Sequence, residues 1–170
     1  VVEFQDYLNV DYYVLTGSFS EDFVRRLKDN VNWIVVSKQP NLTEDFLIEF
    51  QDRVNWKPIL HSRQFSEDFL RKVKDNVNWQ VVSLTQQLTV DFIREFYDRV
   101  DWRLVCHYQQ LTEDIMREFP DWLNWYNVSR YQKLSENFMR DFADKLDWFC
   151  ISINQKLSTD FMREFAEELT

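Results

Sequence analysis

Side chains that could do chemistry are scarce in this chain of 170 residues. There are two histidines, His61 and His107, and two cysteines, Cys106 and Cys150. No acidic or cysteine cluster accompanies either histidine at the spacing of metal ligands, so a metal site has little support. The two cysteines are too few for a disulfide framework and are typical of small core residues in a reducing compartment. We therefore predict a protein that is not an enzyme, with no catalytic residue, no metal and no cofactor.

The abundant carboxylates recur at a constant interval instead of clustering. One aspartate column repeats every 23 residues, at Asp29, Asp52, Asp75, Asp98, Asp121 and Asp144. Repetition of this kind indicates a structural cause, such as a helix surface or turn hydrogen bonds, and no column departs toward a cluster of titratable groups. The single glycine, Gly17, argues against phosphate loops and nucleophile elbows, which need glycine where the backbone turns tightly.

The same period of 23 residues runs through the chain from about residue 19 to its end. Tryptophan follows it at Trp33, Trp56, Trp79, Trp102, Trp125 and Trp148. A hydroxyl residue follows it at Ser20, Thr43, Ser66, Thr89, Thr112, Ser135 and Ser158. Such a register without insertions indicates a tandem repeat. We predict one domain over residues 1–170, with an atypical remnant at 1–18, full repeats at 19–41, 42–64, 65–87, 88–110, 111–133 and 134–156, and a half repeat at 157–170.

Each repeat is predicted to begin with a helix of about 12 residues, a length at which an isolated helix is marginal. In the first full repeat Ser20 can accept hydrogen bonds from the free amides of the first turn, and Glu21 and Asp22 suit the positive end of a helix. Asn32 and its equivalents are expected to end the helix, since Asn and Asp tolerate a left-handed backbone better than other non-glycine residues.

The second half of each repeat is predicted to form a short strand, because it is rich in β-branched residues such as Val35 and Val36. Pro58 lacks a backbone donor, so we expect a local defect in its strand. One helix and one strand per repeat make successive strands parallel neighbours. The predicted fold class is an α/β tandem-repeat solenoid, curved with the strands on the inner side and similar to leucine-rich repeats in architecture alone.

The repeat also resembles a known family. Its pattern, Trp-x-x-[Val/Ile]-Ser-x-x-Gln-x-Leu-[Ser/Thr]-Glu-x-Phe, is most visible at residues 79–92, 125–138 and 148–161. It is similar to a 23-residue repeat in open reading frames of giant DNA viruses and some phages. The glutamine of the pattern stands at Gln86, Gln109, Gln132 and Gln155. The resemblance covers about residues 19–170 and implies a viral or phage origin and an uncharacterised role, without catalytic residues to transfer.

The fifth full repeat departs from the others at two positions. Pro120 falls inside the predicted helix, which it should kink or shorten, and Trp122 occupies a column that otherwise holds Asn, Arg, Lys or Glu. Tyr97 is the counterpart of Pro120 in the preceding repeat, and Tyr126 follows Trp122. We predict a contact patch of Tyr97, Trp122 and Tyr126, because exposed Trp and Tyr favour interfaces. Local repacking around Pro120 is the alternative.

The loop after each predicted strand varies most between repeats. Variable columns on a constant scaffold are where repeat proteins usually place recognition, and Tyr108 and Tyr131 should be neighbours there. A simple solvated loop is the alternative.

The last predicted helix keeps its apolar columns and shows no polar capping substitutions. Solenoids usually need polar caps, so we expect either a fragment of a longer array or an end covered by another chain. The predicted end-association surface is Phe161, Met162 and Phe165.

The charge and hydropathy of the chain restrict the kinds of partner that it can bind. Twenty Lys and Arg against 29 Asp and Glu give a net charge of −9, which disfavours nucleic acid and anionic membranes. No apolar run approaches 18 residues and no signal peptide opens the chain, so we expect a cytoplasmic, host-cell or virus-associated protein.

The predicted function is a scaffold for protein–protein interaction or self-assembly, with no small-molecule substrate. The alternative is an acidic inhibitor of a basic nucleic-acid-binding protein, and the placement of charge discriminates between them.

Overall fold

The computed structural model describes residues 20–169, in which every full repeat consists of two short helices. We call the first helix of a repeat the A helix and the second the B helix. The A helices are α2 (Glu21–Arg26), α4 (Glu44–Glu49), α6 (Glu67–Lys72), α8 (Val90–Glu95), α10 (Glu113–Glu118), α12 (Glu136–Asp141) and α14 (Thr159–Glu164). The B helices are α3 (Trp33–Val36), α5 (Trp56–Ser62), α7 (Trp79–Thr85), α9 (Trp102–Tyr108), α11 (Trp125–Tyr131) and α13 (Trp148–Asn154). The predicted remnant at 1–18 lies outside the described residues.

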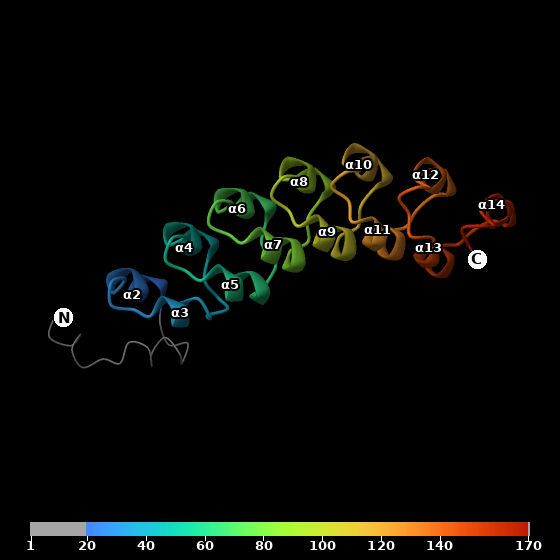
Figure 1. Ribbon diagram of the computed structural model, residues 1–170. Helices are drawn as coiled ribbons and strands as arrows, with labels where there is room; N and C mark the ends of the chain where they lie inside the picture. Colours follow the sequence, from blue (N-terminus) through green and yellow to red (C-terminus); the bar gives the residue numbers. More distant parts are fainter. Residues whose placement is uncertain (1–19, 170) are drawn as a thin grey trace. The chain divides into compact units, whose positions relative to one another are not determined.

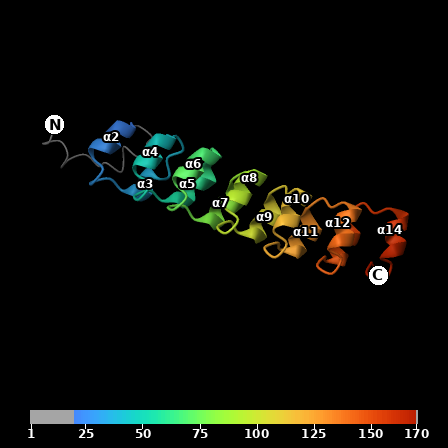
Figure 2. The ribbon, with the colours of Figure 1, turned by 90° about the horizontal axis from the view of Figure 1, so that it is seen from above.

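The helices belong to two compact units, Val1–Gln86 and Gln87–Thr170. The first unit holds α2 to α7, and the second, which we call the C-terminal unit, holds α8 to α14. Within the C-terminal unit the A helices follow one another in one row and the B helices in a second row (Figure 1 and Figure 2). Among the B helices of this unit, α11 contacts both α9 and α13.

The predicted α/β fold class is wrong. No strand forms in residues 20–169, and the segment predicted as a parallel strand is the B helix of each repeat. A solenoid with strands on its inner side is therefore not present in this part of the chain. The β-branched residues fit a helix here because tertiary packing overrides weak intrinsic propensity. Val36, Val82 and Val128, for example, are completely buried.

The residues predicted to end the first helix instead begin the second one. Asn32 has an extended backbone with φ −81° and ψ 103°, and its side chain accepts a hydrogen bond of 3.0 Å from the Ile34 N–H. Asp101 does the same for the Leu104 N–H at 3.2 Å. These are N-caps, and a side-chain oxygen that satisfies a free amide at this position nucleates a helix.

The A helices have six residues, half the predicted length. Both proline predictions are therefore wrong as well. Pro120 lies beyond the end of α10, in the turn that follows it, and kinks no helix. Pro58 is the third residue of α5, where a backbone N–H has no partner within the helix, so it causes no ladder defect.

The predicted hydroxyl caps of the A helices are confirmed, and several of them also bond to the preceding repeat. The Thr43 hydroxyl accepts from the Phe46 N–H at 3.2 Å. The Glu21 carboxylate of the preceding A helix accepts from the Thr43 N–H at 2.6 Å and from its hydroxyl at 2.9 Å. Glu113 repeats these contacts with Ser135 at 2.6 and 3.0 Å. One acidic column thus stabilises the start of the next helix.

Within each unit, tryptophans join their own repeat to the one that follows. The Trp125 indole N–H donates to the Pro120 carbonyl at 3.1 Å, and every other repeated tryptophan bonds the carbonyl five residues before it. This bond closes the turn between an A helix and its B helix. The Trp125 ring then packs on Phe138 and Phe142 of the following repeat, with centroids 6.3 and 5.0 Å apart.

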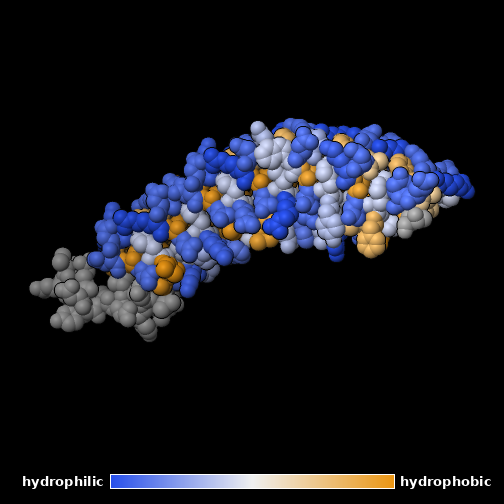
Figure 3. Space-filling view, in the orientation of Figure 1, coloured by the Kyte–Doolittle hydropathy of each residue, from blue (hydrophilic) through white to orange (hydrophobic). Residues whose placement is uncertain are grey.

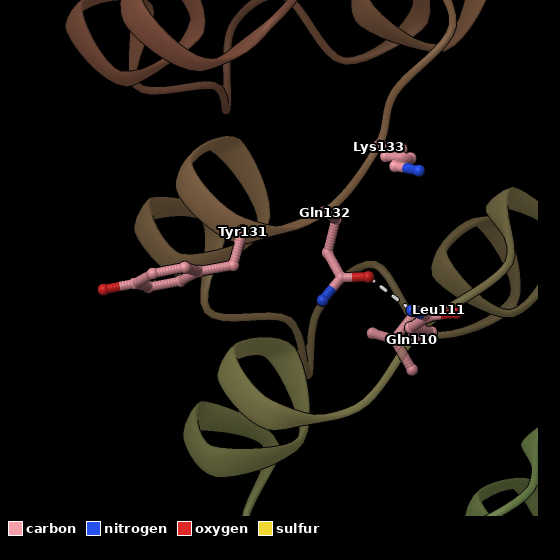
Figure 4. A pocket seen from close by; sticks show the side chains of 5 residues that line it. All are labelled: Gln110, Leu111, Tyr131, Gln132 and Lys133. Atoms are coloured by element: carbon pink, nitrogen blue, oxygen red, sulfur yellow. Dashed lines mark hydrogen bonds between the residues drawn. The ribbon is translucent and has the colours of Figure 1, made fainter.

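A glutamine ends four of the six described B helices, α7, α9, α11 and α13, and it is buried in the first three. Its side chain bonds to the connector of the preceding repeat. Gln132 accepts from the Leu111 N–H at 2.9 Å, as Figure 4 shows. It also donates to the carbonyls of Cys106 and Gln109 at 2.8 and 2.9 Å. In the first unit Gln86 bonds the Phe65 N–H in the same way. We call this arrangement the glutamine clamp. It satisfies three backbone groups that the fold removes from water.

The clamp gives the first testable prediction. Gln132→Leu removes the partners of three backbone groups in and beside a buried connector, and we expect the free energy of unfolding to fall by about 3 kcal/mol. Urea denaturation followed by circular dichroism measures this loss. The matched control is Lys133→Ala, because Lys133 is the exposed neighbour and its loss should change stability by less than about 0.5 kcal/mol. Equal losses in the two variants would contradict a role for the clamp.

Candidate functional site

The outward side of three neighbouring B helices carries exposed aromatic and basic side chains. α9 supplies Arg103, His107 and Tyr108, and α11 supplies Tyr126, Arg130 and Tyr131. We call these six residues the aromatic–basic patch. The next helix, α13, continues the surface with Phe149 and Ile153, which we call the apolar end. Figure 3 shows hydrophobic residues on the surface of the C-terminal unit's B-helix row, beneath the largely hydrophilic A helices.

The buried side of each B helix positions these residues. In α11, Val128 and Ser129 are completely buried. The Ser129 hydroxyl donates to the Trp125 carbonyl at 2.8 Å and accepts from the Asp147 N–H at 2.9 Å. With this side anchored, residues 126 and 130 project together from the opposite side, because they are four positions apart in a helix. The pairs 103 and 107 in α9, and 149 and 153 in α13, follow the same rule.

The rings of the patch stack on one another. The His107 ring lies between Tyr108 and Tyr131, with centroid distances of 4.1 and 4.0 Å and interplanar angles of 18° and 22°. Tyr108 and Tyr131, predicted as neighbours, are therefore connected through His107. The Arg130 guanidinium lies 5.3 Å from the Tyr131 ring centroid. A surface whose side chains are already held in place loses less conformational entropy when it binds a partner.

A surface hollow of about 390 Å³ opens between α9 and α11. Its lining includes Arg103, His107, Tyr108, Tyr126 and Asn127. The Asn127 side chain donates to the Arg103 carbonyl at 2.8 Å, which connects the two helices at this hollow. A smaller hollow of about 150 Å³ lies beside Tyr131, Gln132 and Lys133. Figure 4 shows that Gln132 points toward Leu111, so its amide belongs to the clamp and not to a ligand site.

Charge is segregated between the two rows of helices in this unit. α9, α11 and α13 contain no Asp or Glu, whereas α8, α10, α12 and α14 all contain them. The acids of the A helices pair with arginines, as in Arg94–Glu118 at 2.8 Å and Arg140–Glu164 at 2.9 Å. On the B side the Arg130 guanidinium donates to the Tyr126 hydroxyl at 2.6 Å, a bond that raises the pKa of Arg130. The patch is therefore cationic within an acidic chain.

The structure separates the predicted contact patch into two clusters. Tyr97 meets Trp122 edge-on at 5.5 Å and stacks on Phe119 at 5.1 Å, in the turns that follow α8 and α10. Tyr126 lies on α11, and among residues 20–169 no ring contact joins it to Tyr97 or Trp122. It belongs instead with Tyr108 and Arg130. Tyr97 and Trp122 are both exposed, as the sequence predicts.

Sequence reasoning missed Arg103 and Phe149, and it placed His107, Arg130 and Ile153 in a variable column after the predicted strand without naming them as contact residues. They occupy two columns of the repeat, one through residues 103, 126 and 149 and the other through 107, 130 and 153. The signal that identifies these columns is the absence of acidic residues from every B segment between Trp and Gln. His107, for which the sequence gives little support as a metal ligand, is the centre of a ring stack. Among residues 20–169 no group of three His, Cys, Asp or Glu side chains is placed to hold a metal ion.

The predicted end-association surface is partly occupied within the chain itself. Phe161 is completely buried and packs on Trp148 and Phe165, with ring centroids 6.3 and 4.7 Å apart. Met162 is 44 % exposed, whereas its counterparts Met116 and Met139 are completely buried. Association through this end stays a prediction that involves Met162 and Phe165 but not the ring of Phe161.

Comparisons with known proteins give no match: no family model fits the chain, and no curated protein or solved structure is significantly similar to it. The resemblance to the 23-residue viral repeat therefore stays a prediction. In the part of the chain that the structure describes, no helix has both the length and the apolar character needed to cross a bilayer.

A buried thiol lies directly behind the patch and gives the second testable prediction. Burial raises the pKa of Cys106 from 9.0 to about 11. Because the folded pKa lies above the ordinary one, folding favours the protonated thiol. The resulting stabilisation is complete below pH 9 and is lost as the pH rises from 9 to 11. Between pH 7 and 10.5 the chain should lose about 2 kcal/mol more stability than Cys106→Ser. Urea denaturation at both pH values measures the difference.

Serine is a suitable replacement because it occupies the same column at Ser37, Ser83 and Ser129. Ser129 shows that a hydroxyl at this position finds hydrogen-bond partners within the fold. A pH-dependent loss of the same size in both proteins would assign the effect to other titrating groups and would contradict the prediction.

Proposed function

We propose that this protein is a non-catalytic repeat scaffold that binds a protein partner through the aromatic–basic patch and the apolar end. The observation that carries the proposal is the exposure of large side chains on three adjacent B helices. Tyr108 is 54 % exposed, Phe149 75 % and Ile153 63 %. Contiguous exposed apolar surface on a folded protein is characteristic of an interaction site.

The composition of the surface supports a protein partner. Tyr and Arg are among the residues that contribute most to protein interfaces, and the patch consists of three tyrosines, two arginines and one histidine. Its members stand in columns that change from repeat to repeat, while the buried columns behind them keep small or β-branched residues. A constant scaffold with variable outward positions is the arrangement that repeat proteins use for recognition.

The placement of charge favours the scaffold over the acidic inhibitor. An inhibitor that occupies a nucleic-acid-binding protein would present a continuous negative surface. Here the acidic A helices carry arginines that pair with carboxylates within and between repeats, as Arg25 does with Asp22 and Glu49. The strongest exposed apolar surface lies on the opposite row of helices in the C-terminal unit. We also propose a cytoplasmic, viral or phage setting, which the two free buried cysteines and the repeat pattern support.

Site-specific photo-crosslinking tests the proposal. A photo-reactive phenylalanine derivative at position 126 or 149 should crosslink a protein from the cells in which the chain occurs. The same probe at Asn137, an exposed position on the A helix α12, should not crosslink that protein. Equal crosslinking from both rows of helices would contradict a specific face.

The third testable prediction uses the captured partner. Tyr126→Ala combined with Phe149→Ala should weaken partner binding at least about 10-fold, because truncating central aromatic residues of an interface typically costs more than about 1 kcal/mol each. Biolayer interferometry measures the affinity. The control, Asn137→Ala, should bind as the unchanged protein does, and the urea midpoints of all three proteins should agree closely. Unchanged affinity in the double variant would refute the proposed face.

A further inference from the structure

The geometry of the patch points to the chemistry of its partner. We infer that the aromatic–basic patch binds an acidic, extended protein segment that places carboxylates over α9 and α11 and an apolar side chain on α13. The inference rests on the proposed function and specifies the partner's recognition element. It is carried by two arginines that the fold leaves poorly paired, the hollow beside them and the apolar end.

Arg130 has no carboxylate partner among residues 20–169. Its guanidinium donates to the Tyr126 hydroxyl, which uses one of its five N–H donors. Arg103 is 3.8 Å from Asp101, its nearest carboxylate. That carboxylate also caps α9 by accepting from the Leu104 N–H. Both arginines therefore retain capacity for a further anionic partner.

Other arginines of the same unit are paired differently. Arg94, Arg117, Arg140 and Arg163 each have a carboxylate oxygen within 2.6–3.1 Å. All four belong to A helices, where the acidic columns lie. A chain with 29 acidic residues thus leaves Arg130 without a carboxylate and gives Arg103 a single long contact, to Asp101 at 3.8 Å. Charge complementarity across this surface requires a partner that brings the missing negative charge.

The hollow between α9 and α11 offers a place for a negatively charged group of the partner. Its 390 Å³ is bordered by Arg103 and by the hydroxyl-bearing rings of Tyr108 and Tyr126. A partner carboxylate at its edge would form charge-assisted hydrogen bonds with the guanidinium, which are stronger than neutral ones. The tyrosine rings supply apolar contact for the methylene groups of a Glu side chain.

The apolar end sets a second requirement on the sequence of the partner segment. Phe149 and Ile153 stand four positions apart on α13 and project from it together. Neighbouring packed helices lie about 8–10 Å apart, so α9 and α13 are separated by about 16–20 Å. An extended chain advances about 3.3 Å per residue, so a segment of about six residues spans that distance. The partner should therefore carry acidic residues at one end of such a segment and an apolar residue at the other.

Two other occupants fit these observations less well. Single-stranded nucleic acid stacks its bases on open aromatic faces, but both faces of His107 are covered by Tyr108 and Tyr131. A second copy of the chain would offer the acidic A helices, whose carboxylates already pair with arginines such as Arg117 and Arg140.

Fluorescence anisotropy with the full chain tests the inference. The probe is a labelled synthetic 12-residue peptide with three Glu residues followed, after a Ser-rich spacer of about four residues, by Phe and Leu. The comparison peptide replaces each Glu by Gln. The acidic peptide should bind at least about 10-fold more tightly, and added salt should weaken it. Equal binding of the two peptides would overturn the inference.

Charge reversal supplies the fourth testable prediction. Arg103→Glu combined with Arg130→Glu should weaken acidic-peptide binding by about 100-fold or more, since it replaces two attractive contacts with repulsion. The matched control, Arg163→Glu, changes the same residue type on α14, away from the patch, and should leave binding unchanged. Circular dichroism confirms that each variant is folded. Equal weakening by the reversed pair and by the control would show that net charge alone governs binding and would overturn the inference.

Two further measurements distinguish the other occupants. Tighter binding of a labelled thymidine 12-mer than of the acidic peptide, lost on charge reversal, would assign the patch to nucleic acid instead. Self-association in analytical ultracentrifugation, lost on the same reversal, would assign it to a second copy. If the crosslinked partner needs Tyr126 and Phe149 but tolerates charge reversal, the proposed scaffold stands and the acidic segment is wrong. If it tolerates both sets of changes, the proposed function fails as well.

Discussion

A buried side-chain amide holds together the parts of this protein that have no regular structure. Between one B helix and the next A helix the backbone makes a connector whose groups are withdrawn from water. Gln132 supplies an acceptor and two donations to such a connector, and it does so from the end of the following B helix. Helices of four to seven residues cannot persist alone. The clamp, the tryptophan bond and the buried apolar columns supply the order that their length does not.

Because the short helices depend on their buried contacts for order, an acidic surface and an aromatic surface can coexist on the C-terminal unit. Each B helix of the C-terminal unit is anchored from behind by its buried residues, such as Val128 and Ser129, and from its end by the glutamine. The positions facing outward therefore contribute little to folding and can hold Arg, Tyr, Phe or Ile. The acidic columns, by contrast, take part in the fold, because Glu113 completes the cap of the next A helix. Carboxylates are consequently retained in one row and excluded from the other.

Local signals were enough to predict the repeat, its hydroxyl caps and the proximity of Tyr108 to Tyr131, because a constant period places equivalent residues side by side. The B helix could not be predicted in the same way. Asn32 has the residue type of a helix start and of a helix end, and Val35 and Val36 favour strands when judged without their packing. The tertiary contacts of Val36 decide the outcome. At the candidate site, Phe149 has the residue type of a core position, so nothing local identified it as exposed.

Because of the tryptophan contacts, a repeat responds differently to the loss of the repeat before it and to the loss of the repeat after it. The indole of a repeat bonds its own turn but rests against the phenylalanines of the repeat that follows, as Trp125 does against Phe138 and Phe142. Loss of a following repeat uncovers an indole, whereas loss of a preceding repeat leaves that indole covered. Local unfolding within a unit thus has a direction, and the fluorescence of the tryptophans records which side has opened.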